Sequence, residues 1–180
     1  MSDVAPQLPP RAREIVAEAR ELLEAEGAEA LTMRRLAERL SIRAPSLYKH
    51  LPSKEALETA VIATGFEEAA DRFEVAVARN RRRPLAALAA EYRAFALEHP
   101  HLYRLMTGGP LRRDLLPRGL EARSAAPLLA AAGSEDRARA AFAFAHGMTI
   151  LELDGRFPPD ADLDSAWRVG IRALEREAAR

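Results

Sequence analysis

The sequence contains no cysteine among its 180 residues, which excludes disulfide bonds, thiol catalysis and zinc sites built from thiolates. It also lacks long hydrophobic runs. The longest uncharged apolar stretch of the C-terminal half, residues 140–151, has twelve residues, whereas a membrane-spanning helix needs about 20. The first residues show no basic region followed by an apolar core, so we expect no signal peptide. We therefore expect a cytoplasmic protein with no membrane partner.

A net charge is missing as well, because 27 lysine and arginine residues balance 27 aspartate and glutamate residues. No global field therefore drives the chain onto nucleic acid. The charge is locally uneven, however. Residues 31–54 contain six basic residues and one acidic residue, Glu38, so this segment carries six minus one, or +5, and the remainder −5. Any basic footprint on the molecule must be local.

The composition is that of a helical protein. Glycine and proline gather in a few places, while alanine, leucine, glutamate and arginine fill long stretches. Apolar residues recur at helical spacing, which predicts helices over residues 11–27, 33–40, 45–51, 54–79, 84–97, 101–106, 134–154 and 163–178. Pro117, Gly119 and Pro127 predict that the region around them is irregular or only briefly helical. Residues 140–151 are apolar nearly all round, which predicts a helix buried on most sides.

Three of these helix starts carry cations. Arg34 and Arg35 follow Thr32, Arg43 precedes Pro45, and Lys54 follows Ser53. A helix N-terminus already bears about half a positive charge, so a cation there costs roughly 0.3–1 kcal/mol where a carboxylate would stabilise. Three such conflicts in succession suggest that an external polyanion supplies the missing negative charge, and DNA phosphate is the obvious one.

The same segment has the pattern of a helix-turn-helix, whose second helix enters the major groove of DNA. Thr32 is a good N-cap for the first helix, and Pro45 fits the first turn of the second. Leu47 and Leu51 can then face inward, which leaves a polar and aromatic surface outward. An ordinary helical hairpin with a solvated basic surface is the alternative, and the clustered charge and cation-bearing helix starts argue against it.

Residues 32–57 resemble the DNA-binding signature of the tetracycline-repressor (TetR) family of bacterial regulators. The matching stretches are LTMRRLAERL, SIRAPS, LYKH and PSKEAL. They follow the family's Thr-initiated helix, its turn, its Leu-Tyr-x-His and the Lys that opens the next helix. Ser41 departs from the pattern, because the family commonly has Gly there. Since Ser tolerates positive φ poorly, we expect slight strain or a changed shape in this turn.

The resemblance implies a regulator, usually a repressor, that binds double-stranded DNA at a palindromic operator as a homodimer. It implies phosphate contacts from Thr32, Tyr48 and Lys54, and base contacts from Arg34 and residues 43–46. Arginine can present a bidentate fork to guanine, which fits the second role. Lys49 and His50 could serve either purpose. The residues implied in DNA binding are Thr32, Arg34, Arg43, Ala44, Pro45, Ser46, Tyr48, Lys49, His50 and Lys54.

The resemblance also implies the organisation of the whole chain. We expect an all-α protein of about nine helices, with a three-helix helix-turn-helix domain at residues 8–54 and a larger helical effector-binding and dimerisation domain at residues 55–180. HPHLYRLM and AHGMTILELDGRF resemble a regulatory-domain subgroup marked by Trp-His-Gly, although Ala145 stands in the Trp position. No cofactor is expected.

An unknown small-molecule effector is expected to bind among aromatic and polar residues of the later helices, although most of these residues could simply be core. The candidates are Phe66, Tyr92, Phe95, Tyr103, Arg104, Met106, Phe142 and His146. The apolar helix at residues 140–151, paired with residues 163–174, is the natural dimer interface, or else a buried core helix within one subunit. The candidates for that interface are Phe144, Met148, Leu151, Trp167, Ile171 and Leu174.

An enzyme is the competing class of function. His99 and His101 straddle Pro100 and have no third ligand at a suitable spacing, so we expect no metal site. Glu152 and Asp154 lie two apart on different faces of a helix, which does not suit a catalytic carboxylate pair. No phosphate-binding glycine loop or nucleophile elbow is present. A helical interaction or sensor protein that retains the fold without effector-controlled operator binding remains the alternative to a regulator.

Overall fold

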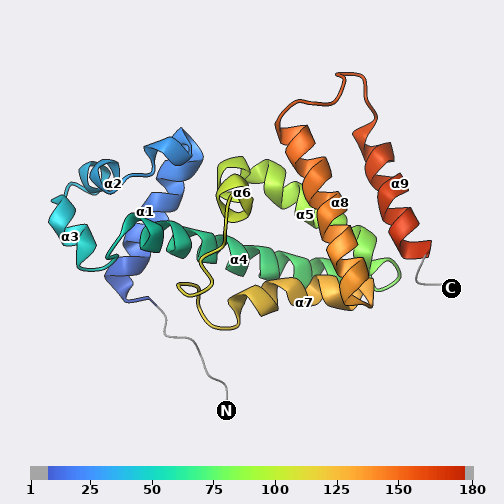
Figure 1. Ribbon diagram of the computed structural model, residues 1–180, viewed down its shortest axis with the longest axis horizontal. Coiled ribbons are helices and arrows are strands. Elements are labelled where there is room, and N and C mark those ends of the chain that lie inside the picture. The colour runs from blue at the N-terminus through green and yellow to red at the C-terminus, as the bar shows by residue number, and fades with distance from the viewer. Residues whose placement is uncertain (1–7, 177–180) are drawn as a thin grey trace, which may run out of the picture. The chain divides into compact units, whose positions relative to one another are not determined.

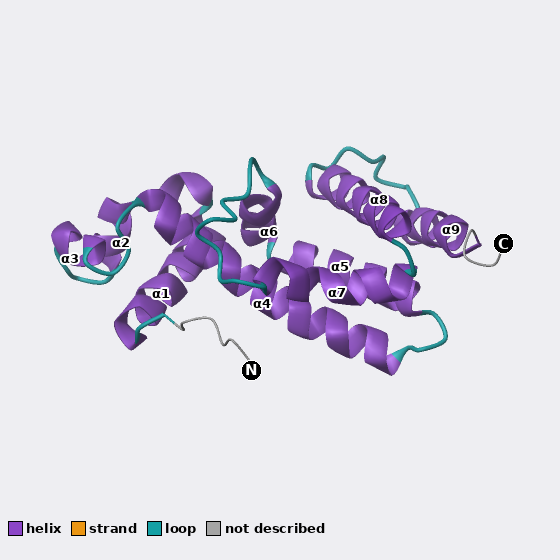
Figure 2. Ribbon diagram, turned by 60° about the horizontal axis from the view of Figure 1, so that its bottom comes forward, coloured by secondary structure: helices purple, strands orange, loops and turns teal. Residues whose placement is uncertain are grey.

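The computed structural model describes residues 8–176, and over that range it contains helices and loops without strands (Figures 1 and 2). The predicted all-α class is therefore confirmed. The helices are α1 Pro10–Glu26, α2 Met33–Arg39, α3 Ala44–Tyr48, α4 Lys54–Arg79, α5 Pro84–Glu98, α6 Pro100–Thr107, α7 Leu120–Ala132, α8 Glu135–Leu153 and α9 Leu163–Arg176, with a short 3₁₀ turn η1 at Ala28–Ala30.

Most helix ends lie where the sequence places them. Gly27 ends α1 at φ 83°, a conformation that glycine adopts without strain. The Ser134 hydroxyl accepts a hydrogen bond from the Arg137 amide at 3.3 Å and so caps α8, as predicted. The last helix is described to Arg176, and its predicted end at Ala178 lies outside the described residues.

The prediction of an irregular region around Pro127 is wrong for residues 120–132, which form α7. Proline in a helix interior removes one backbone hydrogen bond. Three features offset this loss. The flanking residues are rich in alanine, which has the highest helix propensity, and Pro127 itself is buried. Arg123 of α7 also pairs with Asp71 and Glu74 of α4.

The chain forms two compact units. One consists of the described residues through Glu67 together with His99–Glu121, and the other of Glu68–Glu98 together with the described residues from Ala122 onward. In the first unit, α1 packs on α2 and α6, and α2 packs on α3. Its fully buried side chains include Ile15, Leu22, Leu23, Leu31, Leu36, Leu47, Leu57 and Val61.

In the second unit, α5, α8 and α9 pack against one another, with α8 and α9 side by side (Figure 1). Arg93 of α5 ties them together. Its guanidinium donates to Glu152 of α8 at 2.7 and 2.8 Å and to Asp164 of α9 at 2.5 Å, and it lies 5.7 Å from the Trp167 ring centre. The hydrogen bond from Arg93 holds the pKa of Asp164 below its usual value.

The prediction that residues 140–151 are buried on most sides is wrong for this single chain. A stripe of α8 comprising Ala138, Ala141, Ala145 and Thr149 is buried. Phe142 and Leu151 on the same helix remain 46% and 42% exposed. Residues 140–151 are therefore apolar on nearly all sides, but only some of these sides are covered. No helix within residues 8–176 is long and apolar enough to cross a membrane.

Candidate nucleic-acid interface

The first helix of the predicted helix-turn-helix is fixed at its start by Thr32. The Thr32 hydroxyl accepts a hydrogen bond from the Arg35 amide at 3.1 Å, which satisfies one of the free N–H groups of the first turn. Met33, Leu36 and Ala37 are buried and fasten α2 to the unit's core. The opposite face of α2 carries its charged residues into solvent. The predicted N-cap is confirmed.

The turn between α2 and α3 passes through Ser41, whose φ is 54°. Among the described residues it is the one non-glycine residue with positive φ. A side chain in this left-handed region costs energy that glycine would not incur. The strain predicted from the departure at this position is therefore confirmed. The adjacent Ile42 amide donates to the Ala37 carbonyl at 3.0 Å, which closes the turn.

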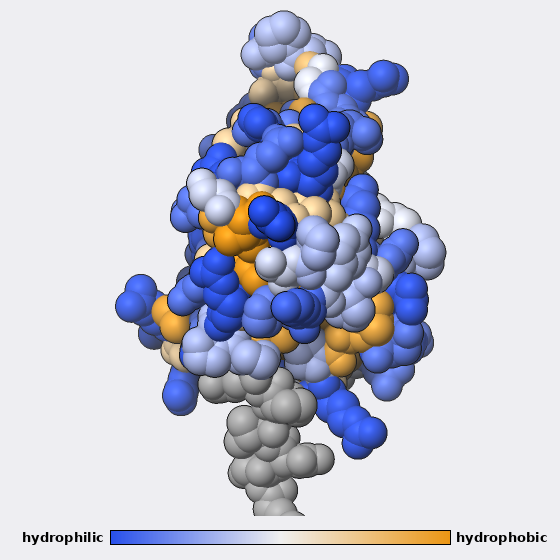
Figure 3. Space-filling model, turned by 90° about the vertical axis from the view of Figure 1, so that its left-hand side faces the viewer, coloured by the Kyte–Doolittle hydropathy of each residue, from blue (hydrophilic) through white to orange (hydrophobic). Residues whose placement is uncertain are grey.

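The second helix, α3, presents its polar side outward. Pro45 stands in its first turn, and Leu47 is fully buried while Leu51 is 3% exposed, so the helix is anchored by its apolar side. Tyr48 is 49% exposed although it is a large ring. Arg43, Pro45, Lys49 and His50 are exposed, and Ala44 and Ser46 are half-buried. Figure 3 shows a mainly hydrophilic surface on the side of the molecule that carries α2 and α3.

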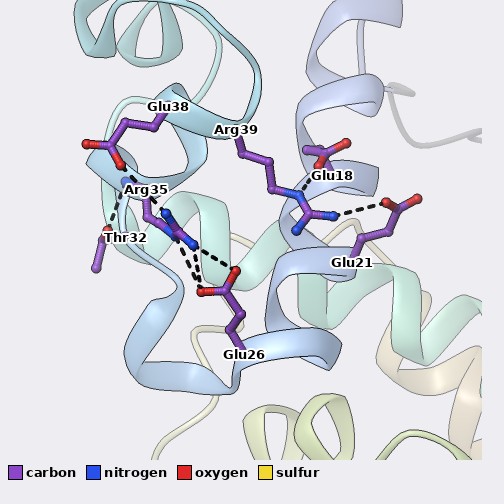
Figure 4. Close-up of polar contacts among 7 residues, drawn as sticks. All are labelled: Glu18, Glu21, Glu26, Thr32, Arg35, Glu38 and Arg39. Carbon is purple, nitrogen blue, oxygen red and sulfur yellow. Dashed lines mark hydrogen bonds and ion pairs between the residues drawn. The ribbon is translucent and has the colours of Figure 1, made fainter.

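The arginines of α2 have different partners (Figure 4). Arg35 donates to both carboxylate oxygens of Glu26, at 3.1 to 3.3 Å, and Arg39 pairs with Glu18 and Glu21. Both arginines thus bind carboxylates of α1 and help to orient α2. The hydrogen bond to Glu18 raises the pKa of Arg39 above its ordinary value. The sequence alone does not predict these ion pairs, because the carboxylates of another helix are not visible in the local sequence pattern.

The other four basic residues of segment 31–54 point to solvent. Arg34 is 89% exposed and bonds through Nε to Glu38 at 3.0 Å, and Lys54 lies 3.3 Å from Glu58. In the part of the chain that the structure describes, Arg43 and Lys49 have no carboxylate within ion-pairing distance. These two cations stand on the exposed side of α3, or at its start, without an internal counter-charge.

The start of α4 differs from the other two starts. The first turns of α2 and α3 contain no acidic residue, but Glu55 follows Lys54 in the first turn of α4. Backbone and Ser53 hydrogen bonds lower the pKa of Glu55. The expectation of three unrelieved helix starts is therefore wrong at α4, where a carboxylate already offsets part of the positive end.

The structure brings together three of the residues predicted to contact an effector, all in the second unit. Tyr92 lies 6.2 Å from Phe142, and Phe142 stacks on His146 at 6.0 Å between ring centres. Phe73 extends this set, stacking on Tyr92 at 6.1 Å. Phe95 of the same unit is buried beneath the Arg72 guanidinium.

The other four candidates lie in the first unit. Tyr103 is buried in α6, Phe66 is half-buried in α4, and Arg104 is exposed. Met106 lies so close to Gly65 that a Cβ on that glycine would meet its sulfur at 2.4 Å. Met106 thus packs directly against the backbone of α4.

The residues predicted for a dimer interface divide into buried and exposed ones. Trp167 and Ile171 are 6% and 4% exposed in the single chain, and Phe144 packs edge-on against Trp167 at 5.6 Å. Met148 and Leu174 are half-buried, and Leu151 is 42% exposed. Val169 of α9, which is not among the predicted interface residues, is 66% exposed.

The two histidines considered as metal ligands have other neighbours. His99 Nδ1 lies 3.6 Å from a Glu24 carboxylate oxygen, and the His101 ring packs over Gly27. No group of three or more metal-ligating side chains is found among residues 8–176.

Comparisons with known proteins match both parts of this chain. Residues 15–61 match the family of bacterial regulatory proteins described as the tetR family, and residues 85–174 match a tetracyclin repressor-like C-terminal domain. A helix-turn-helix transcriptional regulator of Mycobacterium tuberculosis, itself uncharacterized, is 32% identical over 167 residues, covering 85% of this chain and 74% of the relative.

Solved structures share the fold. A protein of unknown function from Rhodococcus sp. RHA1 has a TM-score of 0.78 at 24% identity, covering 94% of this chain and 95% of its own. A TetR variant from Acinetobacter baumannii AYE in complex with minocycline has a TM-score of 0.61 at 25% identity, covering 93% and 94%. The predicted fold, a helix-turn-helix followed by a larger helical part, is therefore confirmed, and this chain belongs to the TetR family of DNA-binding transcriptional regulators.

Proposed function

We propose that the chain is a ligand-responsive repressor that binds a palindromic operator as a homodimer. The observation that supports this most directly is the exposed side of α3. No carboxylate of residues 8–176 pairs with Arg43 or Lys49, and Tyr48 is half exposed beside them. Buried Leu47 holds the helix in place, so these side chains project from a fixed support. That arrangement suits a helix that enters the major groove.

We assign separate roles to the residues predicted to contact DNA. Arg34 and residues 43–46 are the base readers in this proposal, because an exposed guanidinium can bond guanine through two parallel N–H groups. Thr32, Tyr48 and Lys54 hold phosphates, which fixes the register of the protein on DNA. The Thr32 oxygen already accepts the Arg35 amide, and its proton is still available to donate to a phosphate. Lys49 and His50 serve either purpose.

The domain division follows from these roles. Residues 8–54 bind DNA, and residues 55–180 bind the effector and the second subunit. One helix-turn-helix reads only a few base pairs, so two copies about one helical turn of DNA apart are needed for useful specificity. The exposed apolar residues of α8 and α9 support a dimer contact there, with Phe144, Met148, Trp167, Ile171 and Leu174 packed behind it and Leu151 at its surface.

The aromatic set Tyr92, Phe142 and His146 is the proposed effector site in the second unit. A minocycline complex of a related fold supports ligand control of this kind of helical unit. His146 and Gly147 support a regulatory domain of the Trp-His-Gly type, with the small, buried Ala145 in the Trp position. An effector that prefers the non-binding spacing of the two recognition helices would lower DNA affinity by a coupling of typically about 1–3 kcal/mol. When bound to DNA, the protein would be associated with the nucleoid.

Selection of bound DNA from a random pool tests the proposal. A recovered palindrome whose half-sites lie about one helical turn apart is the expected result, because each subunit places one α3 in the major groove. The stoichiometry of binding to the recovered duplex is then measured, and we expect two chains per duplex. Recovery of no common sequence would contradict operator binding and favour a sensor that has kept only the fold.

A further inference from the structure

Glu38 is the single acidic residue of the basic segment 31–54, and it lies on α2 between two arginines. One of its oxygens accepts a hydrogen bond from Arg34 Nε at 3.0 Å, and the other lies 3.9 Å from Arg35 Nη1. Arg35 is held in turn by both oxygens of Glu26, at the end of α1. A row of alternating carboxylates and guanidiniums therefore leads from α1 to Arg34, and Figure 4 shows its first three members.

The contact with Glu38 uses only one edge of the Arg34 guanidinium. Glu38 bonds to Nε of Arg34. Neither Nη1 nor Nη2 of Arg34 bonds to a residue that the structure describes. Those two nitrogens supply the parallel N–H donors that a bidentate contact with guanine requires. The carboxylate thus restrains the side chain while its reading end stays open.

Helix stability does not explain this pair. In the favourable order the carboxylate precedes the cation by four residues, which places each charge at the end of the helix that prefers it. Here the order is reversed. Arg34 lies in the first turn of α2 and Glu38 in the last, so both charges oppose the helix dipole. The helix dipole therefore favours neither residue at its position.

We infer that Glu38 is a positioning residue for sequence readout. It holds Arg34 in the orientation that reads a base, and its negative charge weakens the attraction of the segment to phosphates of any sequence. The first effect raises discrimination between the operator and other DNA, whereas the second lowers the affinity for both alike. The inference rests on the proposed role of Arg34 as a base reader.

The test compares Glu38→Gln with wild-type full-length protein on the selected operator and on a scrambled duplex. Gln keeps the length of the side chain but loses the charge. We expect tighter binding of the scrambled duplex and a fall of about threefold in discrimination, the size of effect that an exposed ion pair supports. Glu14→Gln is the matched control, because Glu14 is also exposed and pairs with an arginine, Arg11, at 2.7 Å within α1. It should leave discrimination unchanged.

Arg34→Ala separates the inference from the proposal on which it rests. Loss of the base contact should lower discrimination roughly five- to 150-fold. In that background, Glu38→Gln should have no further effect on discrimination, and circular dichroism should show all variants folded. If Arg34→Ala lowers discrimination and Glu38→Gln alters both duplexes by one common factor, the positioning role is refuted. If Arg34→Ala itself leaves discrimination unchanged, the base-reading role of Arg34 fails first.

Discussion

Lys54 illustrates how a single cation can add affinity without adding specificity. It is the first residue of α4, exposed and paired only loosely with Glu58 at 3.3 Å. Lys54→Ala should weaken operator and scrambled DNA by the same factor and reduce the slope of log affinity against log salt by about one, because one phosphate contact is lost. Fluorescence anisotropy over a salt series measures both. Arg81→Ala, an exposed charge outside the helix-turn-helix, is the control and should change neither. A selective loss on the operator alone would contradict the phosphate role.

Ser41 is a second residue whose effect can be isolated. Its φ of 54° places a side chain in the left-handed region. Ser41→Gly should stabilise the protein by about 0.5–1 kcal/mol, since the relief of backbone strain exceeds the extra entropy of glycine in the unfolded chain. Ser41→Ala removes the hydroxyl and keeps the strain, so it should be nearly neutral. Urea unfolding of the wild type and both variants measures these changes in stability. If Ser41→Ala stabilises the protein as much as Ser41→Gly, the effect comes from loss of the hydroxyl instead.

At the scale of elements, two glycines inside neighbouring helices should respond oppositely to alanine. A Cβ on Gly170 of α9 would lie 2.1 Å from the Phe144 ring, whereas a Cβ on Gly147 of α8 would meet nothing within 4 Å. Gly170→Ala should therefore destabilise by about 1–3 kcal/mol through overpacking. Gly147→Ala should stabilise by up to about 1 kcal/mol through helix propensity. Thermal unfolding of both variants tests the α8–α9 packing. If Gly170→Ala raises the stability, the Phe144 ring can move away from the added methyl group.

The elements differ in how far sequence predicts them. The bounds of α4 and the caps of α2 and α8 follow from local signals, so they could be read directly. α7 could not, because the cost of Pro127 is local and visible, whereas the burial of Pro127 depends on the tertiary fold, and the pairing of Arg123 with Asp71 depends on a distant helix. The same limit applies to the site. Exposure of α3 follows from its spacing, but the binding of Arg39 to α1 does not.

The whole molecule has no net charge, so its affinity for DNA depends on where its cations stand rather than on how many there are. Of the six basic residues in segment 31–54, Arg35 and Arg39 are engaged with α1, which leaves four toward solvent. The effective footprint of one chain is therefore smaller than the sequence charge of +5 suggests. In the homodimer that we propose, two chains on one operator would double that footprint, so tight binding would depend on dimerisation.

Dimerisation itself can be tested with two leucines of equal exposure. Leu151 of α8 and Leu129 of α7 are each 42% exposed, so an aspartate at either position meets a similar environment in the single chain. If α8 and α9 form the contact between subunits, Leu151→Asp buries a charge at that contact, and the variant should sediment as a monomer at micromolar concentration and lose operator affinity. Leu129→Asp should remain a dimer. Unchanged sedimentation of Leu151→Asp, with its helical content intact, would place the contact on another surface.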